Sequence, residues 1–286
     1  MKKFILVSAL LLNVVVVWGQ INLPTIGSPY TQDFNTLSNS TPSSTLPSGW
    51  FLNETGTGSN INYSAGTGSS ITGDTYSFGS LSSTDRSLGT LQSGSVIPTV
   101  GAHFSNSSGS TITSLSITYT GEQWRLGAAG RVDRLDFQYS TSATSLTTGT
   151  WTDENSLDFT APITTGTLGA FDGNLAANKL TITFTISGLS IASGSTFWIR
   201  WNDLNATGAD DGLGIDDFSI TPLATAPSTA ITTTSLSSSS FTVNCSTPAT
   251  GTVDFTSTGT FTAGNVYTAQ LSDAQGLLEV QQVLEL

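Results

Sequence analysis

Residues Ser195–Thr221, STFWIRWNDLNATGADDGLGIDDFSIT, indicate the class of fold more clearly than any other stretch of the chain. The apolar side chains of Phe197, Ile199 and Trp201 alternate there with Trp198, Arg200 and Asn202. Alternation with a period of two is the pattern of a β-strand. A glycine-hinged loop rich in Asp and Asn follows, and Ile215–Thr221 then has the pattern of a second strand. The order of strand, acidic loop and strand predicts an all-β fold.

Other segments before residue 222 repeat this pattern between glycine-rich turns. Ser, Thr, Gly and Asn dominate while Lys and Glu are scarce, which is typical of sheets with many turns and not of helices. In Leu180–Ser187 the even-numbered apolar residues are expected to face the core. Short strands with one apolar side predict a two-sheet sandwich over residues 20–221. The other strand candidates are Thr75–Phe78, Gly101–Phe104, Thr113–Thr120 and Arg134–Ser140.

Residues 1–19 have the layout of a secretory signal peptide. Two lysines precede a mostly apolar run, and Val17 and Gly19 are acceptable before a cleavage site at Gln20. A transmembrane anchor is the alternative, but the apolar run is short for one and no stop-transfer charges follow. We therefore expect a secreted or cell-surface protein with no membrane insertion after cleavage.

Charge and cysteine usage narrow the class of protein further. Without Lys2 and Lys3 the chain keeps six of its eight cations against twenty acids, so it repels phosphate backbones and we expect no nucleic-acid partner. Cys245 is the single cysteine, which excludes an intrachain disulfide. Stability must come from a large core, with the help of a bound metal as one option.

The composition changes after residue 221. Residues 222–240 read as a Ser/Thr/Pro-rich linker, and residues 241–276 as a second β segment that is short for an independent core. Residues 277–286, LLEVQQVLEL, contain no Ser, Thr or Gly and favour a helix. This tail is out of keeping with the segment before it, which indicates a frameshift or a truncation, with a short terminal helix as the alternative.

Three motifs resemble one family. Tyr30–Asn35 (YTQDFN), Leu46–Trp50 (LPSGW) and Ile215–Ile220 (IDDFSI) are similar to the first and last strands of jelly-roll modules in bacterial type IX-secreted surface proteins. Gingipain-type cleaved-adhesin domains and MAM domains are more distant look-alikes. The resemblance covers Pro29–Thr221 and implies a jelly-roll sandwich of the concanavalin or carbohydrate-binding-module kind. Phe261–Ala274 resembles the middle of an immunoglobulin-like repeat, which implies that an incomplete Ig-like segment follows the sandwich.

The acidic loop is the best candidate for a metal site. Asp210, Asp211, Asp216 and Asp217 lie close together in sequence, and crowded carboxylates repel one another unless a cation or an arginine sits among them. The resemblance implies that Asp33, on the first strand, lies beside the last strand. Calcium binds six to eight oxygen ligands of this kind. The sequence predicts a structural calcium ion held by these five residues, with a solvated loop as the alternative.

Catalytic patterns are scarce. The chain has one His, His103, and one Cys, which excludes most nucleophilic and zinc chemistry. Glycoside hydrolysis needs two carboxylates that flank one bond, whereas Glu54, Glu122 and Glu154 are far apart in sequence. We therefore expect that the chain is not an enzyme.

Aromatic and arginine side chains offer two interpretations. Trp124 and Trp151 lie in turn-rich contexts where an exposed indole could stack on a sugar, and Arg125 could bind an anionic group. The alternatives are core packing for the indoles and ion pairs for the arginines, because Arg125, Arg131 and Arg134 are interspersed with acids.

Two functions are consistent with these patterns. The first is a non-catalytic binding or adhesion module, stabilised by calcium and directed at a polysaccharide or a surface protein. The alternative is a structural spacer in a larger exported protein whose enzyme or sorting domain is missing from this chain. A binder needs Trp124 or Trp151 at the surface beside polar groups, whereas a spacer would bury both.

Overall fold

The computed structural model describes residues 19–224 and, after them, residues 230–238, 240, 251–258, 269–270 and 283–284. The chain divides into two compact units, Met1–Ala224 and Thr225–Leu286. Apart from Gly19, the predicted signal peptide lies outside the described residues. Across the described ranges, no helix is long and apolar enough to cross a membrane.

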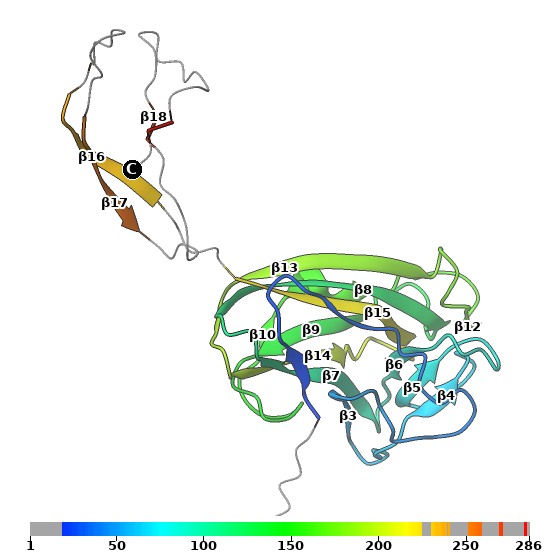
Figure 1. The fold of residues 1–286 in the computed structure, drawn as a ribbon. Coiled ribbons are helices and arrows are strands. Elements are labelled where there is room, and N and C mark those ends of the chain that lie inside the picture. Colours follow the sequence, from blue (N-terminus) through cyan, green and yellow to red (C-terminus); the bar gives the residue numbers. More distant parts are fainter. Residues whose placement is uncertain are drawn as a thin grey trace, which may run out of the picture. The chain divides into compact units, whose positions relative to one another are not determined.

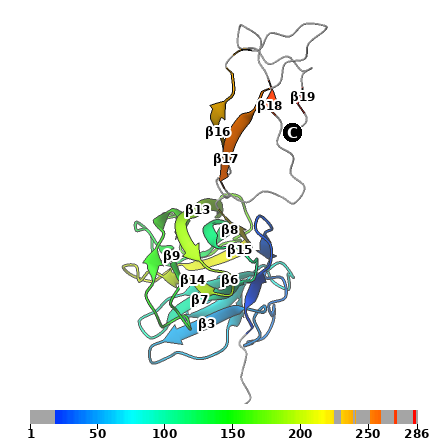
Figure 2. The ribbon, with the colours of Figure 1, turned by 60° about the vertical axis from the view of Figure 1, so that its left-hand side comes forward.

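Two β-sheets make up the first unit (Figure 1). Sheet A has the order β1-β7-β14-β9-β10, with β3 beside β7 and β11 beside β9. Its strands are β1 (Ile21–Leu23), β3 (Trp50–Thr55), β7 (Ile97–Asn106), β9 (Arg134–Ser140), β10 (Thr152–Asp153), β11 (Phe159–Thr160) and β14 (Thr196–Asp203). The neighbouring strands β3, β7, β14 and β9 can be followed in Figure 2.

Sheet B has the order β12-β8-β15-β6-β5-β4, with β13 beside β8 and β2 beside β15. Its strands are β2 (Tyr30–Gln32), β4 (Ser64–Gly66), β5 (Asp74–Phe78), β6 (Ser87–Leu91), β8 (Ile112–Leu126), β12 (Gly169–Ala170), β13 (Lys179–Ile191) and β15 (Gly212–Leu223). One turn of 3-10 helix, η1 (Asn155–Leu157), is the only helical element of the described residues.

The chain crosses repeatedly from one sheet to the other, as in jelly rolls. It passes from β6 in sheet B to β7 in sheet A, back to β8, and on to β9; the same crossing recurs from β13 through β14 to β15. Each strand candidate before residue 222 lies inside an observed strand. The predicted all-β sandwich is therefore confirmed.

The main core lies between the sheets and is centred on Trp201 of β14, which is fully buried. Trp50 of β3 stacks on it with 6.2 Å between ring centroids, and the edge-on ring of Phe137 lies at 5.2 Å. Tyr119 of β8 also packs edge-on against Trp201, and its hydroxyl donates to the carbonyl of Leu157 at 2.6 Å. These contacts follow from strand alternation, which places every second side chain of both sheets in the interior.

A β-bulge interrupts the last strand of the sandwich at Asp217. The pairing register of β15 with β8 shifts between Asp216 and Ser219, and Asp217 has a φ of 48°. Asp tolerates this left-handed conformation better than most residues. Because of the bulge, Phe218 and Ile220 face the core, as Ile215 does before it. Asp216 lies on the opposite face of the strand.

Strand β13 departs from the predicted alternation. Ile182 and Ile186 are buried as expected, but Leu180 is 53% exposed and Phe184 is 37% exposed. The reason is position, because β13 pairs only with β8 and forms an edge of sheet B. An edge strand has no neighbour on one side to complete the cover of its inward side chains.

The second unit contains short antiparallel strands in its described parts. β16 (Ala230–Leu236) pairs with β17 (Val253–Thr258), and β18 (Ala269–Gln270) pairs with β19 (Val283–Leu284). The predicted linker over residues 222–240 therefore differs from the structure, since β15 runs through Leu223 and β16 begins at Ala230. The Thr-rich sequence of β16 favours an extended strand because β-branched residues prefer one. Residues 241–250 lie outside the described ranges, as does most of the tail at 277–286.

Candidate functional site

The face of sheet A that points away from the core carries polar side chains in register. Strand pairing places Asn53, Thr99, Asn202 and Asp136 in one row across β3, β7, β14 and β9. The next row runs through the side chains or backbone of Phe51, Gly101, Arg200, Gln138 and Asp153. We call these two rows the polar face. Apart from Gly101, which has no side chain, and Thr99, which is 9% exposed, the residues of the two rows are half-buried or exposed.

A chain of hydrogen bonds holds the polar face together. Thr99 Oγ1 donates to Asn202 Oδ1 at 3.0 Å, and Asn202 Nδ2 donates to Gln138 Oε1 at 2.8 Å. Arg200 Nε donates to the same Gln138 oxygen at 2.7 Å, while Gln138 Nε2 donates to Asp153 Oδ1 at 2.6 Å. Each planar side chain is thus oriented by its neighbours before any ligand arrives.

Residues 141–151 form a loop that borders the polar face. Arg200 donates a hydrogen bond to the carbonyl of Leu146 and places its guanidinium carbon 3.9 Å from the ring centroid of Trp151. The Trp151 indole N–H donates to the Thr148 carbonyl at 2.8 Å. Leu146 rests on Gly101, where an added Cβ would lie 2.7 Å from Leu146 Cδ2. Half-buried Trp151 is therefore an aromatic group fixed beside the polar rows, with Arg200 against one face of its ring.

The same side of sheet A carries an aromatic cluster next to the loop. His103 and Trp198 face each other across β7 and β14 and stack with 4.4 Å between centroids, and Phe51 packs on Trp198 at 4.9 Å. Burial lowers the pKa of His103 below its usual value, so the ring is neutral near neutral pH. The single histidine thus packs within an aromatic stack.

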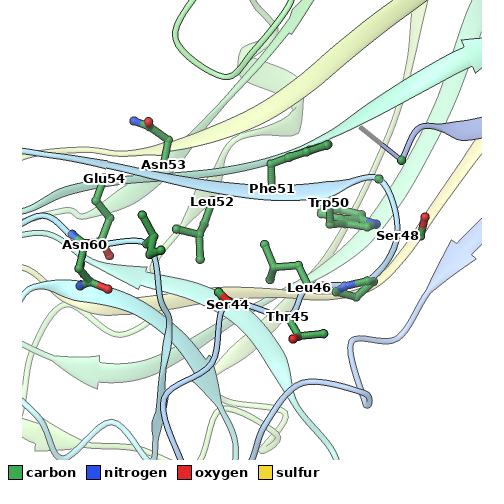
Figure 3. A pocket seen from close by; sticks show the side chains of 14 residues that line it. Ser44, Thr45, Leu46, Ser48, Trp50, Phe51, Leu52, Asn53, Glu54 and Asn60 are labelled. Atoms are coloured by element: carbon green, nitrogen blue, oxygen red, sulfur yellow. Dashed lines mark hydrogen bonds between the residues drawn. The ribbon is translucent and has the colours of Figure 1, made fainter. Parts of the chain in front are cut away.

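A groove lies on the other side of β3 (Figure 3). Its volume is 640 Å³, and Trp50, Leu52 and Glu54 line it together with Leu46 and the segment around Ser44. Figure 3 shows Asn53 on the opposite side of the strand from Leu52 and Glu54. Glu54 accepts hydrogen bonds from the backbone N–H groups of Thr75 and Asn60 at 2.7 and 2.9 Å. The groove is largely apolar, and its one carboxylate is already used within the protein.

The structure separates the residues that the sequence predicts to bind a ligand. Trp124 of β8 is 1% exposed and donates its indole N–H to Glu122 Oε2 at 2.9 Å, which corrects the prediction that its ring meets a ligand. Phe78 stacks on Trp124 in a second, smaller core. Arg125 donates to the carbonyl of Gly68 at 3.2 Å. Trp124 and Arg125 belong to sheet B, whereas Trp151 borders sheet A, so the predicted residues do not form one site.

The predicted calcium ligands are also divided. Asp210 and Asp211 are 5% and 1% exposed and lie beside Arg131. Asp216 is buried near Glu122, while Asp33 and Asp217 are exposed and flank the paired residues Gln32 and Phe218. Within the part of the chain that the structure describes, no group of three or more His, Cys, Asp or Glu side chains is arranged to hold a metal ion. Calcium at these five residues stays a prediction.

Arg131 supplies a positive charge beside two buried carboxylates, those of Asp133 and Asp211. Its guanidinium lies 3.0 Å from Asp133 Oδ2 and 3.2 Å from Asp211 Oδ1, and both carboxylates are buried. Asp211 also accepts from the backbone N–H of Gly127 at 2.7 Å and from Gln123 Nε2 at 2.8 Å. Burial raises the pKa of Asp210 to about 6, with the negative charge of Asp133 adding to the rise. The ion-pair interpretation of the arginines holds for Arg131 and for Arg134, which pairs with Asp136.

Sequence reasoning did not identify the polar face. The signal was present, because Asp136 and Gln138 alternate with core residues in β9, and Arg200 and Asn202 do so in β14. What the sequence lacked was the order of the strands, which places these two pairs side by side.

Comparison with known proteins gives no family. No family model matches the chain, and no curated protein matches it. Several solved structures resemble part of it, and three of them follow. The carbohydrate-binding module TmCBM61, in complex with β-1,4-galactotriose, has a TM-score of 0.31 and 10% identity over 60% of this chain and 88% of that one. The K3 cleaved adhesin domain of Lys-gingipain from Porphyromonas gingivalis has a TM-score of 0.36 and 10% identity over 61% of this chain and 93% of that one.

The third structure is the enzymatically active domain of tailspike protein 4 from bacteriophage CBA120. Its TM-score is 0.32 with 11% identity over 66% of this chain, which spans 22% of the tailspike chain. At this level of similarity, no ligand or activity passes from the three proteins to this chain.

Proposed function

We propose that this chain is a secreted or cell-surface, non-catalytic binding module that holds a glycan on the polar face. The observation that carries the proposal is the pair of polar rows, oriented by their own hydrogen bonds and bordered by Trp151. Ligand sites combine apolar or aromatic surface with a few precisely placed polar groups, and sugars match this combination because their hydroxyls need both donors and acceptors. The resemblance to type IX-secreted surface modules supports an exported surface module and says nothing about its ligand.

The polar face offers both kinds of partner to a sugar hydroxyl. Asn202 and Gln138 each carry an amide oxygen and an amide nitrogen, Arg200 supplies donors, and Asp136 and Asp153 supply acceptors. Asn53, at the β3 end of the first row, extends the surface across four strands. Because acids far outnumber cations in the chain, we expect it to bind neutral polysaccharides in preference to anionic ones.

The second candidate is the structural spacer. It is favoured by the burial of Trp124 and by the internal satisfaction of the polar rows, which already bond to one another. In that case the polar face would only stabilise the sheet, and the chain would display a domain that binds or reacts elsewhere.

A binding experiment distinguishes the glycan-binding module from the structural spacer. It measures binding of the protein to a panel of neutral and anionic polysaccharides, first by affinity electrophoresis and then by calorimetry. Trp151→Ala and Asn202→Ala each remove one group of the proposed site. We expect either variant to bind at least tenfold more weakly, because a loss of about 1.4 kcal/mol of binding free energy lowers the affinity tenfold. Thr183→Ala is the matched control, because Thr183 is exposed on β13 of the other sheet.

Thermal unfolding of each variant checks that it is folded. If no polysaccharide is retained, or if both variants bind as tightly as the wild type, the glycan proposal is wrong and the spacer function replaces it.

A further inference from the structure

One end of the sandwich interior contains a group of buried oxygen atoms that have no hydrogen-bond partner among the described residues. They are both carboxylate oxygens of Asp203, the hydroxyl of Thr90 and the side-chain oxygen of Gln92. These residues are 6%, 0% and 4% exposed. Buried polar atoms are nearly always paired, so several unpaired oxygens in one region need an explanation.

The topology brings these residues to the same place. Asp203 ends β14 and continues the inward-facing series of Ile199 and Trp201. Thr90 lies on β6, two residues after the core residue Leu88, and Gln92 follows two residues later. The two strands belong to opposite sheets, so their inward side chains meet across the interior.

The electrostatic surroundings of Asp203 place the Thr90 hydroxyl and the backbone of Gln92 beside its carboxylate. Burial raises the pKa of Asp203 well above its usual value, and the nearby charges of Asp133 and Asp210 add to the rise. The Thr90 hydroxyl and the Gln92 backbone N–H lie near enough to oppose it, although neither has the geometry of a hydrogen bond to Asp203. Arg131 contacts Asp133 and Asp211, and no ion pair of Asp203 is found among the described side chains.

We infer that Asp203, Thr90 and Gln92 form a binding site for a hard cation of the calcium class. A carboxylate, a hydroxyl and an amide oxygen are all ligand types that Ca²⁺ accepts, and backbone carbonyls commonly complete its coordination. The neighbouring carboxylates of Asp133 and Asp210 make the potential there more negative without being required as ligands. This site differs from the one predicted at the acidic loop, and it does not depend on the proposed glycan function.

A bound cation would also have a structural consequence. It would join β6 of sheet B to the end of β14 in sheet A, at the end of the sandwich where Arg131 organises the adjacent carboxylates. Because the site is assembled only when the two sheets pack, the ion would bind the folded state and not the unfolded chain.

The test uses the purified protein after removal of metals with EDTA. Adding Ca²⁺ to about a hundredfold excess over its dissociation constant is expected to raise the Tm by about 5–10 °C. Mg²⁺ should raise it less, because Mg²⁺ gives up its waters reluctantly. Tb³⁺, a luminescent substitute for Ca²⁺, should be sensitised by Trp201, which lies about 7 Å from Asp203 along the same strand.

Three variants locate the ion. Asp203→Asn and Thr90→Val keep the side-chain shape and should each abolish or strongly reduce both the Tm shift and the Tb³⁺ signal. Asp217→Asn is the matched control, since Asp217 is exposed and belongs to the acidic loop; it should retain both.

Absence of a Tm shift and of a Tb³⁺ signal in the wild type would overturn the inference and leave buried water as the partner of these oxygens. Loss of both signals in Asp217→Asn alone would overturn it in favour of the acidic loop. Should Asp203→Asn not fold, Thr90→Val decides: retention of both signals there refutes the site.

Discussion

Replacing Asp216 by Asn is expected to stabilise the protein near neutral pH and to flatten the pH dependence of its stability. Asp216 is 5% exposed on β15, and Glu122 lies nearby on β8. Burial, followed by the negative charges of Glu122, Asp217 and Asp85, raises the pKa of Asp216 to about 8, although the backbone N–H of Asp217 donates to it at 2.7 Å. The folded protein therefore keeps a proton on Asp216 that the unfolded chain has released.

The sign and the size follow from proton linkage. The pKa is raised on folding, so the stability contributed by protonated Asp216 is full below the unfolded pKa and is lost as the pH rises toward the folded value. With pKa values of 3.8 unfolded and about 8 folded, the free energy of unfolding falls by about 3 kcal/mol between about pH 5 and about pH 7 through this residue alone. Asn cannot ionise, but its amide oxygen can still accept from Asp217.

Urea unfolding measures how the free energy of unfolding of the wild type and of Asp216→Asn depends on pH. Unfolding is followed by tryptophan fluorescence, in EDTA, over about pH 4 to about pH 8. The difference in unfolding free energy between the two proteins should grow by about 3 kcal/mol in favour of the variant from about pH 5 to about pH 7. Asp33→Asn is the control, because it replaces an exposed aspartate that is not among the charges that raise the pKa of Asp216. A difference that stays constant across the pH range would show that Asp216 is ionised in the folded protein and would refute the reasoning. Destabilisation of the variant at pH 7 would refute the expected gain in stability.

Two further substitutions test the packing that supports the sites. Arg131→Met should destabilise the first unit by about 3–5 kcal/mol, because it leaves the buried carboxylates of Asp133 and Asp211 without their cation. Urea unfolding measures this loss, and a loss under about 1 kcal/mol would mean that the ion pairs are dispensable. Gly101→Ala should cost about 1–3 kcal/mol and displace the loop that carries Trp151, since the new Cβ would lie 2.2 Å from the Ile199 carbonyl oxygen. Quenching of tryptophan fluorescence by acrylamide should then increase, and unchanged quenching would contradict a role for Gly101 in seating the loop.

Local patterns in the sequence determined the strands and their inward faces. Phe197, Ile199 and Trp201 alternate with Trp198, Arg200 and Asn202, and the structure turns the first three into the main core because a strand of period two faces it with only one set of side chains. Trp198 is buried on the opposite face, against Ala143 and Leu146. The same reasoning located β8, β9 and the last strand, and so the all-β class.

Tertiary structure decided which of the chemically capable residues meet. From the sequence, Trp124 could be either a surface indole or a core residue. In the structure Gly173 packs against its ring and the Phe171 backbone N–H donates to its carbonyl at 2.7 Å, so chain segments distant in sequence cover it. Leu180 and Phe184 have the alternation of core residues and are left partly exposed because β13 has no partner beyond it.

Strand order likewise placed Gln138 beside Arg200, which is more than sixty residues away in the chain. Packing between the two sheets placed Asp203 beside Thr90, which is more than a hundred residues away. Alternation is a local property, set by the geometry of one strand, and it can be read without knowing the neighbours. Pairing between strands and packing between sheets are not local, because they depend on which register buries the most apolar surface over the whole unit. The polar face and the buried oxygen cluster are products of that second step, which is why no stretch of sequence contains either of them.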